Sequence, residues 1–246
     1  MPKNNNFIVV IPARYKSSRL PGKPLKDICG KTMLVRTYEI CASVVNKSKI
    51  YVATDDPRIA EECKKNNINF LITSKKCLTG TDRIAEVSKK IKKDFYINLQ
   101  GDEPLFNPKD LKKLIYYAKK NSSEIINGYC PIFSRNDFFN QNIPKVVVDK
   151  NGYLMYMTRA SIPSNKKKSF KFAWRQVCAY SLPYEALNFF YKNKKKTILE
   201  SQEDCELIRF LENGFKIKMI LMSPDSIAVD TPNDLKKVRN IFRNIN

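Results

Sequence analysis

The first half of the chain alternates short apolar runs with longer amphipathic stretches. A short apolar run bounded by turn residues is typical of a buried strand, and an amphipathic stretch is typical of a helix. The alternation predicts strands at 7–11, 49–53, 68–72 and 94–99, and helices at 32–43, 57–66, 82–92 and 108–120. Strands that alternate with helices indicate an α/β fold with a doubly wound, mostly parallel sheet.

From about residue 124 the strands follow one another with short or irregular connections. They are predicted at 125–132, 145–149, 153–159 and 175–181. Asn151-Gly152 lies between two of them and favours a tight hairpin turn. Further along, the pattern predicts helices at 184–192 and 199–213 (the latter ended by Gly214), strands at 216–222 and 226–229, and a last helix at 233–243. No repeat and no Gly- or Ser-rich linker divides the chain, so we expect one domain over 1–246.

Capping residues place several helix starts. Asp56-Pro57 fits an N-cap followed by the first helical residue, and Thr81-Asp82 marks another start. The run 29–32, Cys-Gly-Lys-Thr, resembles the end of a Walker A phosphate loop, but Leu25 stands where that loop needs a glycine. We interpret this run as a tight turn that leads into the N-cap of the helix at 32–43.

The composition restricts the chemistry. The chain has no histidine, which excludes Ser-His and Cys-His nucleophilic catalysis and most zinc sites. A catalytic metal would need oxygen ligands, which suit Mg²⁺ or Mn²⁺. The seven cysteines form no CxxC pair and indicate reduced thiols in the cytoplasm. No apolar run approaches the ~18 residues of a membrane helix, and the apolar start is too short for a secretory signal.

The net charge of +21 permits a nucleic-acid-binding protein as an alternative of a different class. The lysines are spread over the whole chain, however, and most occupy polar positions of amphipathic helices or loops. We therefore interpret the charge as solvated surface that also attracts an anionic substrate.

A basic loop follows the first strand at the sheet edge where open α/β sheets bind ligands. It carries Arg14, Ser18, Arg19 and Lys23, interrupted by prolines and Gly22. Such residues form either a solvated turn or a clamp for a triphosphate, with bidentate arginine contacts and a point-charge lysine.

Two aspartates follow predicted strands at this same edge. Asp102 comes after the strand at 94–99, and Asp230 comes after the strand at 226–229. Taken singly, Asp102 fits an Asx-turn and Asp230 fits a helix N-cap. Taken together, two carboxylates at one edge make a joint metal site plausible.

Several motifs, in order, resemble the 3-deoxy-manno-octulosonate cytidylyltransferases (CMP-Kdo synthetases), and the resemblance covers nearly the full chain. The motifs lie at 11–25, 52–56, 79–83, 98–104, 199–200 with Arg209, and 229–232. The resemblance implies a Rossmann-like fold of the nucleotide-diphospho-sugar-transferase type. It implies a nucleotide-binding half at 1–123, a β-rich segment for the sugar acid and dimerisation at 124–215, and a return to the main sheet at 216–246.

The implied enzyme transfers CMP from CTP to the anomeric hydroxyl of Kdo and releases pyrophosphate, for lipopolysaccharide synthesis in the cytoplasm. Its implied cofactor is Mg²⁺, held by Asp102 and Asp230. The implied partners are CTP, a Kdo-like sugar acid and a second copy of the chain, with no nucleic acid and no membrane.

The resemblance also implies roles for single residues. Arg14, Lys23 and Asp102 would be catalytic. The nucleotide would contact Ala13, Arg14, Ser18, Arg19, Lys23, Thr79, Gly80, Thr81 and Arg83. The sugar acid would lie beside Gln100, Arg159, Gln176, Tyr180, Glu203 and Glu206.

The chain departs from the family pattern at one of these positions. Gln176 stands where the family commonly has a histidine of the sugar pocket. A glutamine forms hydrogen bonds but carries no charge. Activation of a related acid, such as 8-amino-Kdo or a sialic-acid-like sugar, therefore remains an alternative.

Overall fold

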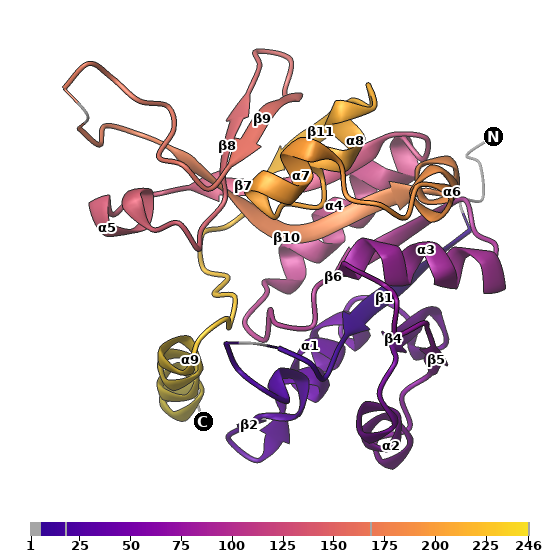
Figure 1. Ribbon diagram of the computed structural model, residues 1–246. Helices are drawn as coiled ribbons and strands as arrows, with labels where there is room; N and C mark the ends of the chain where they lie inside the picture. The colour runs from indigo at the N-terminus through magenta and orange to yellow at the C-terminus, as the bar shows by residue number, and fades with distance from the viewer. Residues whose placement is uncertain (1–5, 18, 168, 246) are drawn as a thin grey trace.

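The structure is a computed structural model that describes residues 6–17, 19–167 and 169–245, and its centre is a nine-stranded sheet (Figure 1). The main path of the sheet runs in the order β11-β7-β10-β6-β1-β4-β5. These strands are β1 (Phe7–Ala13), β4 (Ile50–Thr54), β5 (Phe70–Ile72), β6 (Phe95–Leu99), β7 (Ile125–Pro131), β10 (Trp174–Pro183) and β11 (Ile217–Leu221). Strands from all three sequence segments thus join one sheet.

Most neighbours along this main path are parallel. β1 pairs in parallel with β4 and β6, β4 with β5, and β11 with β7, whereas β10 is antiparallel to β6 and β7. The predicted mostly parallel sheet is confirmed. β8 (Lys145–Val148) and β9 (Leu154–Thr158) form an antiparallel hairpin beside β10, and Gly152 in its turn has φ +79°, as the Asn-Gly signal predicts.

The described chain contains the following helices, several of which cover the two faces of the sheet. They are α1 (Met33–Ala42), α2 (Pro57–Lys65), α3 (Gly80–Lys90), α4 (Pro108–Lys120), α5 (Arg135–Phe139), α6 (Tyr184–Lys192), α7 (Ile198–Glu203), α8 (Ile208–Glu212) and α9 (Pro232–Ile245). Every residue of β1 is buried, and alternate side chains face two separate cores. Val9 belongs to a core that includes residues of α1, α2 and α4, whereas Val10 belongs to a core that includes residues of α3, α6 and α8. A strand buried on both faces is expected at the centre of a doubly wound sheet.

The capping predictions hold with one shift. Asp56 caps α2 with Pro57 in its first turn, and Thr32 caps α1 after the tight turn at Gly30, which has φ +82°. α3 begins earlier than the pattern predicts, because Thr79 is its N-cap and forms a capping box with Asp82.

The single helix predicted at 199–213 is wrong. The segment forms α7 and α8, separated at Asp204, whose φ is +49°. Arg159 explains the break, because its guanidinium donates to the carbonyl oxygens of Glu203 at 2.8 Å and Asp204 at 3.1 Å. Because Arg159 supplies these hydrogen bonds from outside the helix, both carbonyl oxygens keep a partner where α7 ends.

The strand predicted at 226–229 is also wrong. Residues 222–231, called the strap below, run without regular structure from β11 to α9. α9 then packs on Leu20, Ile28 and Met33, and Arg239 donates to the carbonyl of Asp27. The last helix therefore rests on the opening residues and lies apart from the main sheet (Figure 1).

Two small pairs complete the described elements. β2 (Asp27–Ile28) and β3 (Lys31–Thr32) form a two-stranded sheet, and short 3₁₀ turns lie at η1 (Lys23–Leu25) and η2 (Lys47–Lys49). Within the described ranges, no helix combines the length and the apolar character needed to cross a membrane.

Candidate functional site

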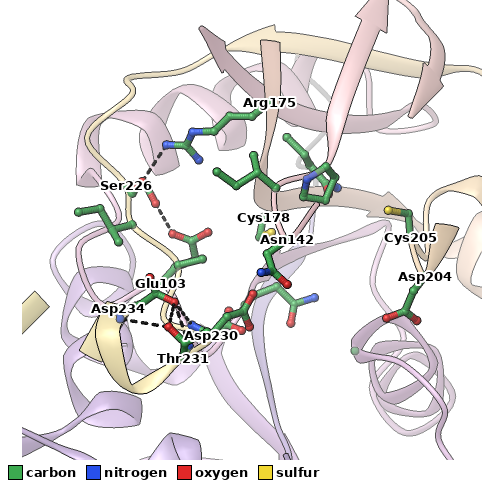
Figure 2. Close-up of a pocket in the computed structure, with 18 of the residues that line it drawn as sticks. Glu103, Asn142, Arg175, Cys178, Asp204, Cys205, Ser226, Asp230, Thr231 and Asp234 are labelled. Atoms are coloured by element: carbon green, nitrogen blue, oxygen red, sulfur yellow. Dashed lines mark hydrogen bonds between the residues drawn. The ribbon is translucent and has the colours of Figure 1, made fainter. Parts of the chain in front are cut away.

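An open cleft of about 810 Å³ lies between the opening loop, the N-terminus of α3, β10 and the strap (Figure 2). Most residues predicted to bind nucleotide, sugar acid or metal line it. They are Ala13, Arg14, Arg19, Lys23, Thr79, Gly80, Arg83, Gln100, Asp102, Arg159, Gln176, Tyr180, Glu206 and Asp230. Thr81 and Glu203 do not line it, and Ser18 lies outside the described residues.

Lys23 lies between the two predicted metal ligands. Its Nζ is 2.7 Å from Asp102 Oδ2 and 3.0 Å from Asp230 Oδ1. Burial lowers the pKa of the Lys23 ammonium, but the two carboxylates outweigh burial and leave the pKa above the ordinary lysine value. Arg19 Nη2 also approaches Asp230 Oδ1, at 3.2 Å. Residues 207 positions apart in the chain thus share one charge cluster.

Asp230 is free for this role because it does not cap α9. Thr231 does so instead: Asp234 N donates to Thr231 Oγ1, and Asp234 Oδ2 accepts from Thr231 N. The alternative interpretation of Asp230 as an N-cap is therefore wrong.

The two carboxylates fit a hard divalent cation. Both reach one point, which the Lys23 ammonium occupies, and carboxylate oxygens are the ligands that Mg²⁺ prefers. No cluster of three or more His, Cys, Asp or Glu side chains suited to a metal is found in the described part of the chain. Mg²⁺ commonly takes one or two carboxylates and completes its shell with phosphate oxygens and water, so two ligands suffice.

The cleft rim is cationic on the side of α7. Arg14 is exposed at the end of β1, Arg159 lies under the α7–α8 break, and Lys196 pairs with Asp204 at 2.7 Å. The hydrogen bond from Lys196 lowers the pKa of Asp204. A polyanionic ligand entering the cleft therefore meets positive charge from two sides.

The N-terminus of α3 is closed by a half-buried carboxylate. Glu206 accepts from Thr81 N at 3.0 Å and from Gln100 Nε2 at 3.1 Å. Burial raises the pKa of Glu206, and its hydrogen bonds at α3 oppose that rise. A Cβ at Gly80 would lie 2.8 Å from Gln100 Nε2, so glycine leaves room for this contact.

Arg83 has a different environment from the exposed arginines of the opening loop. It is buried, with Nη2 3.0 Å from Asp55 Oδ1 and Nη1 2.8 Å from Thr73 Oγ1. Its charge is thus neutralised within the protein. This contact orders the loop between β4, β5 and α3 beside the cleft.

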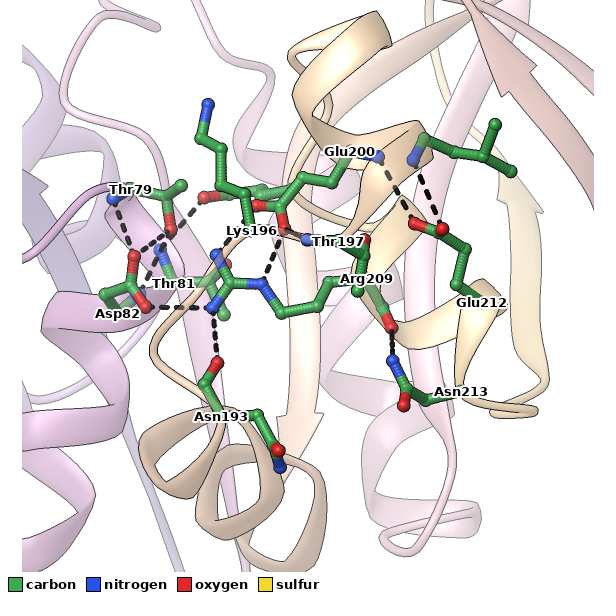
Figure 3. Close-up of polar contacts among 12 residues, drawn as sticks. Thr79, Thr81, Asp82, Asn193, Lys196, Thr197, Glu200, Arg209, Glu212 and Asn213 are labelled. Atoms are coloured by element: carbon green, nitrogen blue, oxygen red, sulfur yellow. Dashed lines mark hydrogen bonds and ion pairs between the residues drawn. The ribbon is translucent and has the colours of Figure 1, made fainter.

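A second buried ion cluster joins α3 to α7 and α8 (Figure 3). Arg209 is fully buried and donates to Glu200 at 2.6 and 2.7 Å and to Asp82 at 3.1 Å. Its guanidinium also lies 3.7 Å from the centroid of the Phe190 ring. Because Asp82 belongs to the capping box of Thr79, the cluster fixes the α3 terminus that faces the cleft.

The residues predicted for the sugar acid divide into two groups. Gln176 Nε2 lies 3.1 Å from Tyr180 Oη and 3.4 Å from Asn127 Oδ1, and both Gln176 and Tyr180 line the cleft. Glu203 instead accepts from Thr158 Oγ1 at 2.7 Å and from Arg159 N at 2.9 Å. Glu203 thus ties α7 to β9.

Sequence reasoning missed Glu103. It lines the cleft beside Asp102, is 1% exposed, and accepts a hydrogen bond from Ser226 Oγ. Burial raises the pKa of Glu103 to about 7, against the effect of the Ser226 hydrogen bond. The signal was present in the Gly-Asp-Glu-Pro run, where a second acid directly follows the predicted metal ligand.

Comparisons with known proteins indicate the class of protein to which the chain belongs. The cytidylyltransferase family pattern matches residues 8–219, so fold, cleft and pattern together define a cytidylyltransferase, a class of nucleotidyltransferase. A 3-deoxy-manno-octulosonate cytidylyltransferase of Protochlamydia amoebophila is 38% identical over 241 residues, covering 94% of this chain and 92% of that protein. The mitochondrial one of Arabidopsis thaliana is 35% identical over 246 residues, covering 98% and 85%. The chain belongs to the 3-deoxy-manno-octulosonate cytidylyltransferase family.

A solved structure supports the same assignment. CMP:2-keto-3-deoxy-manno-octonic acid synthetase complexed with CTP superposes with a TM-score of 0.89 at 32% identity, covering 98% of this chain and 100% of that one. The correspondence thus covers nearly the whole chain.

Proposed function

We propose that this chain transfers CMP from CTP to the anomeric hydroxyl of Kdo or a close relative and releases pyrophosphate. The observation that carries the proposal is the charge cluster of Lys23, Asp102 and Asp230 in a cleft open to a polyanion. The family to which the chain belongs supports the choice of CTP and Kdo.

In this proposal Arg14, Arg19 and Lys23 bind the triphosphate, and Thr79, Gly80 and Arg83 line the cleft beside it. Ala13 ends the strand that presents the loop, and Ser18 belongs to the same nucleotide contact. Lys23 is a charge placed where negative charge grows on the α-phosphate, so it stabilises the transition state more than the ground state.

Asp102 and Asp230 would hold Mg²⁺, which supplies charge neutralisation at the phosphates and acidifies a nearby hydroxyl. Gln100, Arg159, Gln176, Tyr180 and Glu206 line the cleft and orient the sugar acid in our proposal. Glu203 acts only indirectly, by accepting the backbone N–H of Arg159. Arg159 supplies the cation for the carboxylate of the sugar. Positioning and electrostatics then account for most of the rate.

Pyrophosphate release with CTP and Mg²⁺ tests the proposal across Kdo, 8-amino-Kdo, a sialic acid and no sugar. Release with one acid only would support the reaction and identify the acid. If none of these acids gives pyrophosphate release but calorimetry shows CTP binding, the substrate would be a different acid. The absence of both pyrophosphate release and CTP binding would contradict the cytidylyltransferase assignment for this chain.

Gln176 provides a sharper test of the sugar side. Because Gln176 hydrogen-bonds to Tyr180 at the cleft wall, Gln176→His is expected to change the kcat/KM ratio between two sugar acids by about 10-fold. The KM for CTP should stay near the wild-type value. Gln141→His, at an exposed loop position, is the matched control. A change in the KM for CTP alone would place Gln176 outside the sugar pocket.

We further propose a cytoplasmic homodimer. The seven cysteines are all free thiols, which suits a reducing compartment. Light scattering at micromolar concentration is expected to give twice the mass of the 28.5 kDa chain. A mass of one chain across the same concentrations would contradict the dimer.

A further inference from the structure

The strap (residues 222–231) carries Asp230 into the cleft, and few backbone hydrogen bonds fix its path. Among the described residues, its backbone amides donate to backbone carbonyls only near its ends, from Met222 to Tyr129 and from Val229 to Asp102. Side chains hold the middle (Figure 2). The position of Asp230 therefore depends on a small number of identifiable anchors.

The central anchor is a pair of buried polar side chains. Ser226 Oγ donates to Glu103 Oε2, with Glu103 1% and Ser226 3% exposed. Arg175 Nη2 supports the same place by donating to the carbonyl oxygens of Pro224 at 3.0 Å and Ser226 at 2.8 Å. A buried carboxyl group costs stability unless it is hydrogen-bonded. Ser226 supplies this hydrogen bond to Glu103.

The anchor joins the two predicted metal ligands through the chain itself. Glu103 directly follows Asp102, and the carbonyl of Asp102 accepts from Val229, next to Asp230. The turn that carries one ligand thus binds the strap that carries the other at two points, Ser226 and Val229. These contacts do not involve Lys23.

We infer that Glu103 is a positioning residue: by accepting the hydrogen bond of Ser226, it holds the strap so that Asp230 faces Asp102. The inference rests on the proposed function, in which this aspartate pair binds the divalent metal. Residues that orient metal ligands commonly contribute 10–100-fold to metal affinity.

Mn²⁺ binding measured by electron paramagnetic resonance in the presence of CTP tests the inference, because this signal does not depend on turnover. Ser226→Ala is expected to weaken Mn²⁺ binding by about 10-fold. It should lower kcat more than it changes the KM for CTP. Glu103→Gln keeps an oxygen acceptor of the same shape and is expected to retain most of the affinity, whereas Glu103→Ala should lose as much as Ser226→Ala.

Ser223→Ala is the matched control within the strap. Ser223 also donates to a carboxylate, that of Asp110, but on the side of α4 away from the cleft. Its loss should lower the melting temperature as Ser226→Ala does and leave Mn²⁺ affinity near the wild-type value. If Ser226→Ala does not fold, Glu103→Ala and Glu103→Gln carry the same comparison.

Equal Mn²⁺ affinity in Ser226→Ala and the wild type would overturn this inference but not the proposed metal site. So would a Glu103→Gln variant as weak as Glu103→Ala, because the charge of Glu103 rather than its hydrogen bond would then matter. A wild-type protein that binds CTP but no Mn²⁺ would overturn both this inference and the proposed metal site.

Discussion

The Asp102→Asn variant is expected to lose at least about 10³-fold in kcat, which corresponds to about 4 kcal/mol of transition-state stabilisation. The substitution removes one of two carboxylates that face a single cationic point. It preserves the shape of the side chain, and the backbone carbonyl that anchors Val229 remains. The melting temperature should therefore stay within roughly 4 °C of the wild-type value.

Single-turnover rates with saturating CTP and sugar acid would measure this loss. Asp225→Asn is the matched control, since Asp225 lies exposed in the strap and outside the cleft lining. It removes the same charge a few residues from Asp230 and should leave kcat nearly unchanged. Wild-type turnover in Asp102→Asn would refute the metal assignment.

Arg209→Met is expected to destabilise the fold by about 3–5 kcal/mol. The variant leaves Glu200 and Asp82 buried without their shared cation, and it removes the contact with Phe190. For a chain of this length the corresponding fall in melting temperature is roughly 10 °C. Urea titration would give the free energy of unfolding directly.

Two further variants separate the loss of charge pairing from the loss of packing. Lys64→Met breaks an exposed pair with Glu61 and should change stability by less than about 1 kcal/mol. Arg209→Met combined with Glu200→Gln should recover part of the loss, because one uncompensated buried charge is removed as well. Equal destabilisation by Arg209→Met and Lys64→Met would contradict the buried network.

Local patterns predicted most of the elements because periodicity and capping are local properties. The bounds of α4 and α6 coincide with the expected ranges 108–120 and 184–192. The helix break at Asp204 was not predictable in this way, because Arg159, far away in sequence, satisfies the carbonyls there. The apolar residues Ile227, Ala228 and Val229 led to the wrong prediction of a strand in the strap. The sheet ends at β11, and the strap adds no strand beside it.

The site follows the same division. The ends of parallel strands meet at one edge, so the sequence placed Asp102 near the opening loop correctly. The sequence did not show that Arg83 is neutralised by Asp55, nor that Glu203 faces β9. It also did not show the contact between Ser226 and Glu103, which are 123 positions apart. These contacts join residues that are distant in the sequence, and a single sequence does not show which distant residues meet in the fold.

The docking of α9 on the opening residues has a consequence during synthesis. Lys23 leaves the ribosome early, but its partner Asp230 follows 207 positions later. At about 5–20 residues per second, the loop waits on the order of ten seconds or longer for that partner. Until then its cations have no internal counter-charge from the strap, and Leu20, Ile28 and Met33 lack the apolar cover that α9 provides. A released chain truncated before residue 230 would therefore combine a nearly complete sheet with an exposed hydrophobic patch, which a chaperone or protease would recognise.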